Sequence, residues 1–188
     1  MTTPVDRPRK YGDDTAAARL AMFKKCLAAI AKLPGVRSVA FPYKIGCGLG
    51  GGNWVDYRAA LEEFARSSGA PRVRVYKLPQ NMHTPRNVPT ARVQSTPAAG
   101  VGQVVEVQGD LLSAKEQYIA QQCNCTSHRA LGLSAAVFKR FPHSNVYQFP
   151  GRRQAGTISV HGGQLGQRGV INMMAQVNTG RYVAFANG

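Results

Sequence analysis

A run of glycines between an apolar segment and a helical one constrains the fold of this chain more than any other feature. Five glycines fall within residues 46–52, after the apolar residues 39–41 and before a helical stretch that starts near Trp54. Glycines at a strand-to-helix junction let the backbone turn sharply and let amide N–H groups converge, and the helix dipole adds its positive end. The run therefore predicts an α/β fold with a turn that binds a phosphate or diphosphate.

This turn matches neither of the two common phosphate-binding signatures. No Gly-Lys-Ser/Thr sequence ends it, as a P-loop requires, and no acidic residue follows at the distance of a dinucleotide-binding fingerprint. The alternative interpretation is a flexible turn without function. The density of glycines at this junction favours the binding turn.

Helical and strand patterns alternate over the rest of the chain. Apolar side chains recur at helical spacing in residues 14–33, 54–64 and 133–141, and an acid or threonine precedes the first helix as a cap. Strands are predicted at 39–41, 72–78, 104–107, 118–124, 157–160 and 170–174. This alternation predicts a mixed central sheet covered by helices. Residues 79–102, which carry prolines and no periodicity, are predicted to be a linker or exposed loop.

Composition narrows the partners and the compartment. The formal net charge of +15 favours a polyanionic partner such as nucleic acid or a diphosphate ligand, although a generally basic surface explains it as well. The four cysteines and four histidines lack zinc-ligand spacing, so we expect buried thiols, a reducing compartment and no metal. No apolar run approaches the ~20 residues of a membrane span, and the first ten residues do not resemble a signal peptide. We expect a cytoplasmic or nuclear protein without membrane contact.

Several segments together resemble the macro domain family. Residues 39–42 and 45–54 are similar to its second ligand loop, in the branch of ADP-ribose-1''-phosphate phosphatases and terminal ADP-ribose glycohydrolases. Gly109-Asp110-Leu111-Leu112 resembles the end of the first macro strand. Residues 119–125 with 131–133 resemble the next strand and first ligand loop, and residues 170–176 resemble the middle strand. The resemblance implies a three-layer α/β/α fold with a mixed central sheet.

These motifs stand in swapped order. A usual macro domain begins with the Gly-Asp strand and has the glycine loop late, whereas here residues 12–78 match the late half and residues 103–188 the early half. A circular permutation, natural or engineered, explains this order, with residues 79–102 joining the usual ends. We therefore expect residues 1–188 to form a single macro domain, in which the strand at 103–108 lies beside the one at 72–78.

The resemblance implies that the ligand is ADP-ribose, free or on a macromolecule, and assigns its contacts. Asp110 would accept from the adenine amine beside the backbone of Leu111, and Asn124 would hold the distal ribose. The structural alternatives are a turn-forming acid and an asparagine that bonds local backbone. The diphosphate would lie between Gly132 and Leu133 on one side and, on the other, Gly46, Cys47, Gly48, Leu49, Gly50 and Gly51. Valine at Gly50 is expected to abolish binding, by barring a positive φ or intruding on the ligand, with the fold intact.

Catalysis is less firmly implied than binding. The glycohydrolases use a lysine with an aspartate in the glycine loop, but that position here is Gly50. Asn53 stands where the phosphatase-like members carry an aspartate, so neither position keeps a carboxylate base. The candidate catalytic residues are Asn124, which could position water, and His161, near the place expected for the lysine. No cofactor is implied.

Three functions stay open. The preferred one is ADP-ribose binding with hydrolysis of ADP-ribose derivatives, either de-ADP-ribosylation or dephosphorylation of ADP-ribose-1''-phosphate. The second is a non-catalytic reader of ADP-ribose or poly-ADP-ribose. The third is a nucleic-acid-binding module, for which the net charge speaks. Sparse aromatic residues, 8% of the chain, make this third function the weakest as a primary role.

Overall fold

One six-stranded sheet organises the molecule. The computed structural model describes residues 14–48, 50–67, 71–79, 102–148, 153–163 and 167–177. The strands are β1 (Ser38–Pro42), β2 (Arg72–Lys77), β3 (Val104–Gln108), β4 (Tyr118–Asn124), β5 (Ile158–His161) and β6 (Gly169–Gln176), in the spatial order β3-β2-β1-β4-β6-β5. β5 pairs antiparallel with β6, and the other neighbours pair parallel. The prediction of an α/β fold with a mixed sheet is confirmed.

Two of the three helices in the described chain, the first and the second, begin at capping side chains. The helices are α1 (Ala16–Ala31), α2 (Trp54–Arg66) and α3 (Leu133–Arg140), with 3-10 turns at Leu111–Ser113 and Pro142–Ser144. The Thr15 hydroxyl accepts from the amide of Ala18, and the Asn53 side chain accepts from the amide of Val55. Such side chains satisfy N–H groups that have no partner in the first turn. Asn53 therefore has a structural role, as the residue that starts α2.

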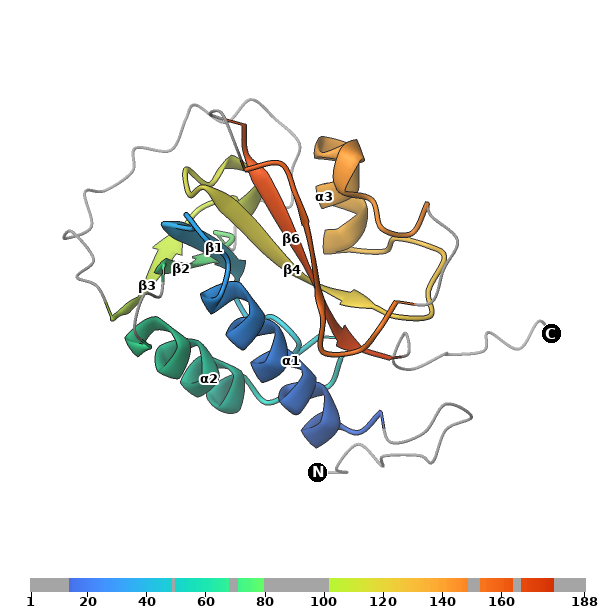
Figure 1. Ribbon diagram of the computed structural model, residues 1–188, viewed down its shortest axis with the longest axis horizontal. Helices are drawn as coiled ribbons and strands as arrows, with labels where there is room; N and C mark the ends of the chain where they lie inside the picture. The colour runs from blue at the N-terminus through green and yellow to red at the C-terminus, as the bar shows by residue number, and fades with distance from the viewer. Residues whose placement is uncertain are drawn as a thin grey trace.

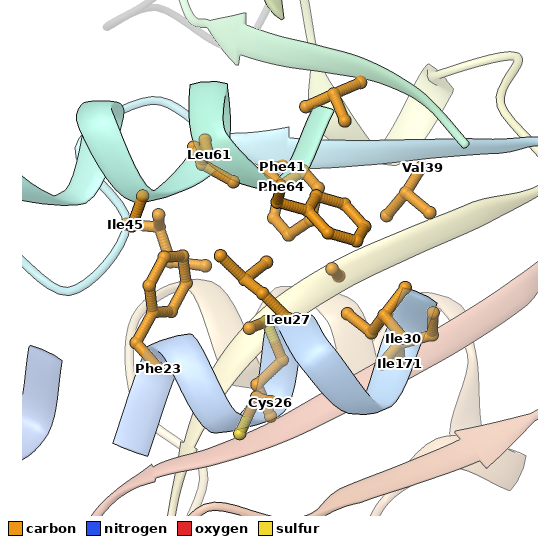
Figure 2. Packing of buried hydrophobic residues seen from close by; sticks show 14 of the residues in the cluster. Phe23, Cys26, Leu27, Ile30, Val39, Phe41, Ile45, Leu61, Phe64 and Ile171 are labelled. Carbon is orange, nitrogen blue, oxygen red and sulfur yellow. The ribbon is translucent and has the colours of Figure 1, made fainter. Parts of the chain in front are cut away.

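The helices cover both faces of the sheet. Alternate side chains of the strands point to opposite faces, so Val39 and Phe41 join one core cluster and Ala40 the other. Figure 1 shows α1 and α2 side by side over one face and α3 over the other. In Figure 2, Phe23, Cys26, Leu27 and Ile30 of α1 and Leu61 and Phe64 of α2 pack against the strands. Full burial of each such large side chain contributes roughly 1.5–3 kcal/mol.

The two halves of the sequence meet inside this sheet. β2 and β3 pair in parallel, with Val73 opposite Val104, so the expected neighbourhood of the strands at 72–78 and 103–108 is confirmed. Both core clusters also contain residues from before and after residue 90. Because the strands are parallel, the chain must return from the end of β2 to the start of β3, about 17–20 Å for strands of this length. The predicted linker at 79–102 is long enough, although nearly all of it lies outside the described residues.

Within the described part of the chain, no helix has the length and apolar character that a membrane crossing would need.

Candidate functional site

The predicted ligand residues follow the carboxyl ends of the parallel strands. The glycine loop at 43–53 follows β1, Asp110 follows β3, and Asn124 ends β4. Because these strands are parallel, their carboxyl ends lie at the same end of the sheet. Ligands of open α/β sheets bind at this end. The structure thus brings together at one end the segments from which the ligand contacts were predicted; Leu49 lies outside the described residues.

The glycine loop is closed by its own hydrogen bonds, yet some of its amides remain free. The amide of Gly52 donates to the carbonyl of Gly46, and that of Gly51 to the carbonyl of Gly48, both at 3.0 Å. The amides of Gly46, Gly48 and Gly50 donate to no acceptor within the described chain. These three amides are not consecutive, since the amide of Cys47 donates to the carbonyl of Lys44. Free backbone N–H groups in a glycine-rich turn can nevertheless bind an anion. The loop therefore has unused donors at the place where the sequence predicts a diphosphate.

Packing against Tyr57 explains several of the glycines. A Cβ at Gly46 would lie 2.3 Å from the Tyr57 ring, and one at Gly52 would lie 2.5 Å from it. Gly46 also has a φ of +76°, which favours glycine. Tyr57 is buried, and burial raises the pKa of its hydroxyl to about 12. Its hydroxyl oxygen has no hydrogen-bond partner. The ring of Tyr57, on α2, thus packs directly against the backbone of the loop at Gly46 and Gly52.

Gly50 and Gly48 differ in the space that a side chain would find at each position. A Cβ at Gly50 would meet the carbonyl oxygen of Gly46 at 2.5 Å, and φ of Gly50 is not positive. The expectation that valine at Gly50 would spare the fold is wrong, because the side chain would collide with the loop itself. Gly48 is exposed, and a Cβ there would meet nothing within 4 Å. Gly48 is therefore a position at which a side chain can be added without disturbing the loop.

A buried ion pair holds the loop from the start of α1. The Arg19 guanidinium donates to the Gly50 carbonyl at 2.6 Å and to the Asp14 carboxylate at 3.0 and 3.2 Å. The same carboxylate accepts from the amide of Val177, the residue after β6. The side chains of Arg19 and Asp14 are 6% and 1% exposed, so solvent screens the pair very little. This pair fixes the loop to α1 and to the end of β6, and the sequence pattern gave no sign of it.

Asn124 ends β4 as predicted, and only the oxygen of its side-chain amide is hydrogen-bonded within the described residues. Its Oδ1 accepts from the amides of Thr126 and Ser127 at 2.8 and 2.7 Å, which shapes the turn after β4. Its Nδ2 is buried and has no partner. The predicted role of both donating to and accepting from a ribose is thereby narrowed, since the oxygen is occupied by the turn. The nitrogen is thus a buried donor that the turn does not use.

Asp110 and Leu111 are in place with structural tasks. The Asp110 carboxylate accepts from the amide of Leu112 at 2.9 Å and so caps the 3-10 turn after β3. Asp110 is half-buried, whereas Leu111 is buried in the cluster under α3. The turn-forming role weighed against adenine recognition is therefore present. One capping bond leaves the carboxylate with further acceptor capacity.

The segment predicted to form the first ligand loop ends at an uncapped helix. Gly132 precedes α3 with a φ of +56°, and no side chain bonds to the first turn. A Cβ at Gly132 would meet nothing within 4 Å. The first N–H groups of a helix have no partner inside it, so α3 presents free donors here. Leu131 and Leu133 beside them are 66% and 39% exposed.

His161 lies at the other end of the sheet. It ends the antiparallel strand β5 and is opposite Val170, near the start of β6. Its Nε2 is 2.7 Å from the Ser159 hydroxyl, and burial, with His143 nearby, lowers the pKa of its ring. The structure therefore does not bring His161 together with Asn124, because β5 runs opposite to the other strands.

A groove of about 820 Å³ opens at the same amino end as His161. It is lined by Leu33, Pro34, Val36, Tyr118, Val160, Gly162 and Gln167. None of the predicted ligand residues borders it. The polar groups without partners and the groove thus lie at opposite ends of the sheet.

The described residues form no group of three or more His, Cys, Asp or Glu side chains that could hold a metal ion. Cys47, in the glycine loop, is half-buried, and burial raises the pKa of its thiol. Comparison with protein-family models, with curated proteins and with solved structures gave no match for this chain.

Proposed function

We propose that this chain binds ADP-ribose at the carboxyl end of its sheet and that it is a circularly permuted macro domain. The observation that carries the proposal is the glycine loop, in which the amides of Gly46, Gly48 and Gly50 have no acceptor among the described residues. The loop resembles a macro ligand loop in sequence and follows a parallel strand. Free backbone donors there suit a diphosphate.

The strand order supports the permutation. When the strands are counted from β3 through β6 and then from β1 to β2, the first and the last become parallel neighbours at one edge. A chain cut between them would leave its two ends on these neighbouring strands, one at the carboxyl end of the sheet and one at the amino end. The three layers and the mixed sheet also agree with the expectation from the resemblance.

Binding is favoured over hydrolysis. A hydrolase that works by general base catalysis needs a carboxylate or another base that can take a proton from water. The Asp14 carboxylate is bonded to Arg19, and Asp110 caps a turn. Gly50 and Asn53 stand at the two positions where the resembled hydrolases carry an aspartate, and Asn53 caps α2. We therefore propose a binding module that recognises ADP-ribose without turning it over.

A second candidate, binding to nucleic acid, rests on one surface feature. The ammonium groups of Lys44 and Lys77 lie 5.6 and 4.9 Å from the centre of the Tyr43 ring. Neither lysine forms an ion pair within the described chain. Lys44 also has a φ of +56°, a conformation that residues other than glycine rarely adopt. Two unpaired cations beside an aromatic ring suit the phosphates and bases of a single strand.

Calorimetry with ADP-ribose, ADP, AMP and a short oligonucleotide separates these functions. We expect ADP-ribose to bind most tightly, to remain intact during a long incubation and to lose only modest affinity as salt rises. Gly48→Val should abolish this binding without changing the thermal unfolding temperature, because the side chain would enter only the ligand space. Oligonucleotide binding should fall steeply with salt and survive the Gly48 change. ADP-ribose binding by the Gly48→Val protein at full strength would contradict the proposal.

A further inference from the structure

Two adjacent glutamines on β4 lie on opposite faces of the sheet. Gln121 belongs to the α3 face, where its Nε2 donates to Asn172 at 2.8 Å and Asn172 in turn donates to the carbonyl of Ser144 at 2.8 Å. Gln121, Asn172 and Ser144 are 1%, 0% and 0% exposed. The oxygen of Gln121 has no partner, but it lies in this closed core. The nitrogen of Gln121 thus has a structural task.

Gln122 points to the opposite face, under the glycine loop. A Cβ at Gly50 would lie 3.4 Å from the Gln122 Nε2, so the side-chain amide reaches the loop. The Oε1 of Gln122 is buried without a partner, and its Nε2 makes no hydrogen bond within the described chain. Gln122 as a whole is only half-buried. Its amide is therefore free to both accept and donate at the edge of the loop.

A buried acceptor without a partner costs free energy, and native structures rarely keep one without a reason. Asn124, two residues further along the same strand, adds the unpartnered donor Nδ2. The pairing of β4 with β6 shifts register between Gln122, opposite Met173, and Asn124, opposite Gln176, so the extra residue lies in β6. Because β4 itself keeps its alternation, the two side chains share a face. An acceptor and two donors, all uncharged, complement a pair of neighbouring hydroxyl groups, since each hydroxyl both donates and accepts. The glycine loop beside them would hold the phosphates.

We propose that Gln122 is a specificity-determining residue that contacts the hydroxyls of the distal ribose, with its side-chain amide on the sugar next to the diphosphate. The proposal rests on the proposed function, because the sugar is the part of ADP-ribose that lies beyond the diphosphate. Gln122 reads this sugar together with the Nδ2 of Asn124. ADP, which lacks the sugar, does not engage it.

The test compares Gln122→Met with the matched control Gln121→Met, by calorimetry with ADP-ribose and with ADP and by denaturant unfolding. Gln122→Met should weaken ADP-ribose binding roughly 5- to 30-fold, the loss expected when one hydrogen-bond partner is removed. Its affinity for ADP should stay within about twofold, and its stability should hold or rise, because methionine leaves no buried polar atom unpaired. Gln121→Met should keep both affinities but lose stability, because Asn172 loses its donor.

The outcomes are distinguishable. A wild-type protein that binds no ADP-ribose contradicts the proposed function. A wild-type protein that binds it, with a Gln122→Met variant of equal affinity, overturns the role of Gln122 alone. Equal losses for ADP-ribose and ADP, or a loss of stability in Gln122→Met like that in Gln121→Met, would show that Gln122 supports the loop instead of reading the sugar.

Discussion

The two ends of the sheet use glutamine in opposite ways. At the amino end, Gln117 engages its whole side chain: Oε1 accepts from the amide of Arg37 at 2.8 Å, and Nε2 donates to the carbonyl of Gly163 at 3.3 Å. At the carboxyl end, neither amide atom of Gln122 has a partner among the residues that the structure describes. The side-chain amide of Gln117 therefore links two segments of the fold, whereas that of Gln122 makes no hydrogen bond within the described residues.

The groove and the unbonded polar groups also lie at different ends of the sheet. The groove beside Val160 and Gly162 lies at the amino end, where the side-chain amide of Gln117 is already engaged. The free amides of the glycine loop and the free nitrogen of Asn124 lie at the carboxyl end. A ligand is oriented by a few polar groups, so these mark a site better than the volume of a groove does.

The largest expected effect comes from breaking the ion pair that supports the carboxyl end. Arg19→Met removes the guanidinium that bonds both the buried Asp14 carboxylate and the Gly50 carbonyl, and we expect a loss of about 3–5 kcal/mol in the free energy of unfolding. Denaturant unfolding measures it. Adding Asp14→Asn should recover part of the loss, because the charge disappears while an acceptor for Val177 remains. A loss below about 1 kcal/mol, the range of an exposed pair, would contradict the structural role of the pair.

A smaller effect should separate two glycines of the same loop. Gly46→Ala forces a side chain onto the Tyr57 ring at a positive φ, so we expect a loss of about 1–3 kcal/mol in stability. Gly48→Ala has open space and an ordinary φ, and its stability should change by less than about 0.5 kcal/mol. Thermal unfolding of both variants makes the comparison. Equal destabilisation would show that the loop is packed throughout and has no open side for a ligand.

The smallest effect concerns pH at the amino end. Burial lowers the pKa of His161 in the folded protein, so the unfolded chain takes up the proton more readily. The stability from this residue is therefore complete above the unfolded pKa of about 6.5 and is lost as pH falls through it toward the folded pKa. Unfolding at pH 7.5 and 5 should show a smaller decline for His161→Gln than for the wild type. ADP-ribose affinity should be equal in both proteins; a large loss in the variant would return His161 to the site.

Much of the fold follows from local patterns, while the supports of the site depend on contacts distant in sequence. Apolar spacing predicted the first helix, whose Phe23, Leu27 and Ile30 are buried, and the glycine run marked the turn after β1. The bond from Arg19 to Gly50 spans 31 residues, so no local pattern reveals it. The direction of β5, which carries His161 away from Asn124, is likewise set by pairing in the sheet.

Gln122 shows what a closer use of strand periodicity could add. It precedes Asn124 by two residues in β4, and it shares the face of Asn124 because the extra residue of the register shift there lies in β6. Of these two residues, the sequence predicted a ligand role only for Asn124. A glutamine inside a strand has no sequence pattern that distinguishes a free side-chain amide from a hydrogen-bonded one. Gln121, the same residue type one position earlier, is engaged. Only the three-dimensional contacts separate the two.

Backbone amide NMR during a titration with ADP-ribose tests the central claim most directly, because it reports both ends of the sheet in one experiment. The account predicts that the largest shifts occur at the amides of Gly46, Gly48 and Gly50 and at the side-chain amides of Gln122 and Asn124. The amides of Val160, Gly162 and Gln117 should stay in place. Shifts concentrated at the amino-end groove, or no shifts at saturating ADP-ribose, would contradict the account.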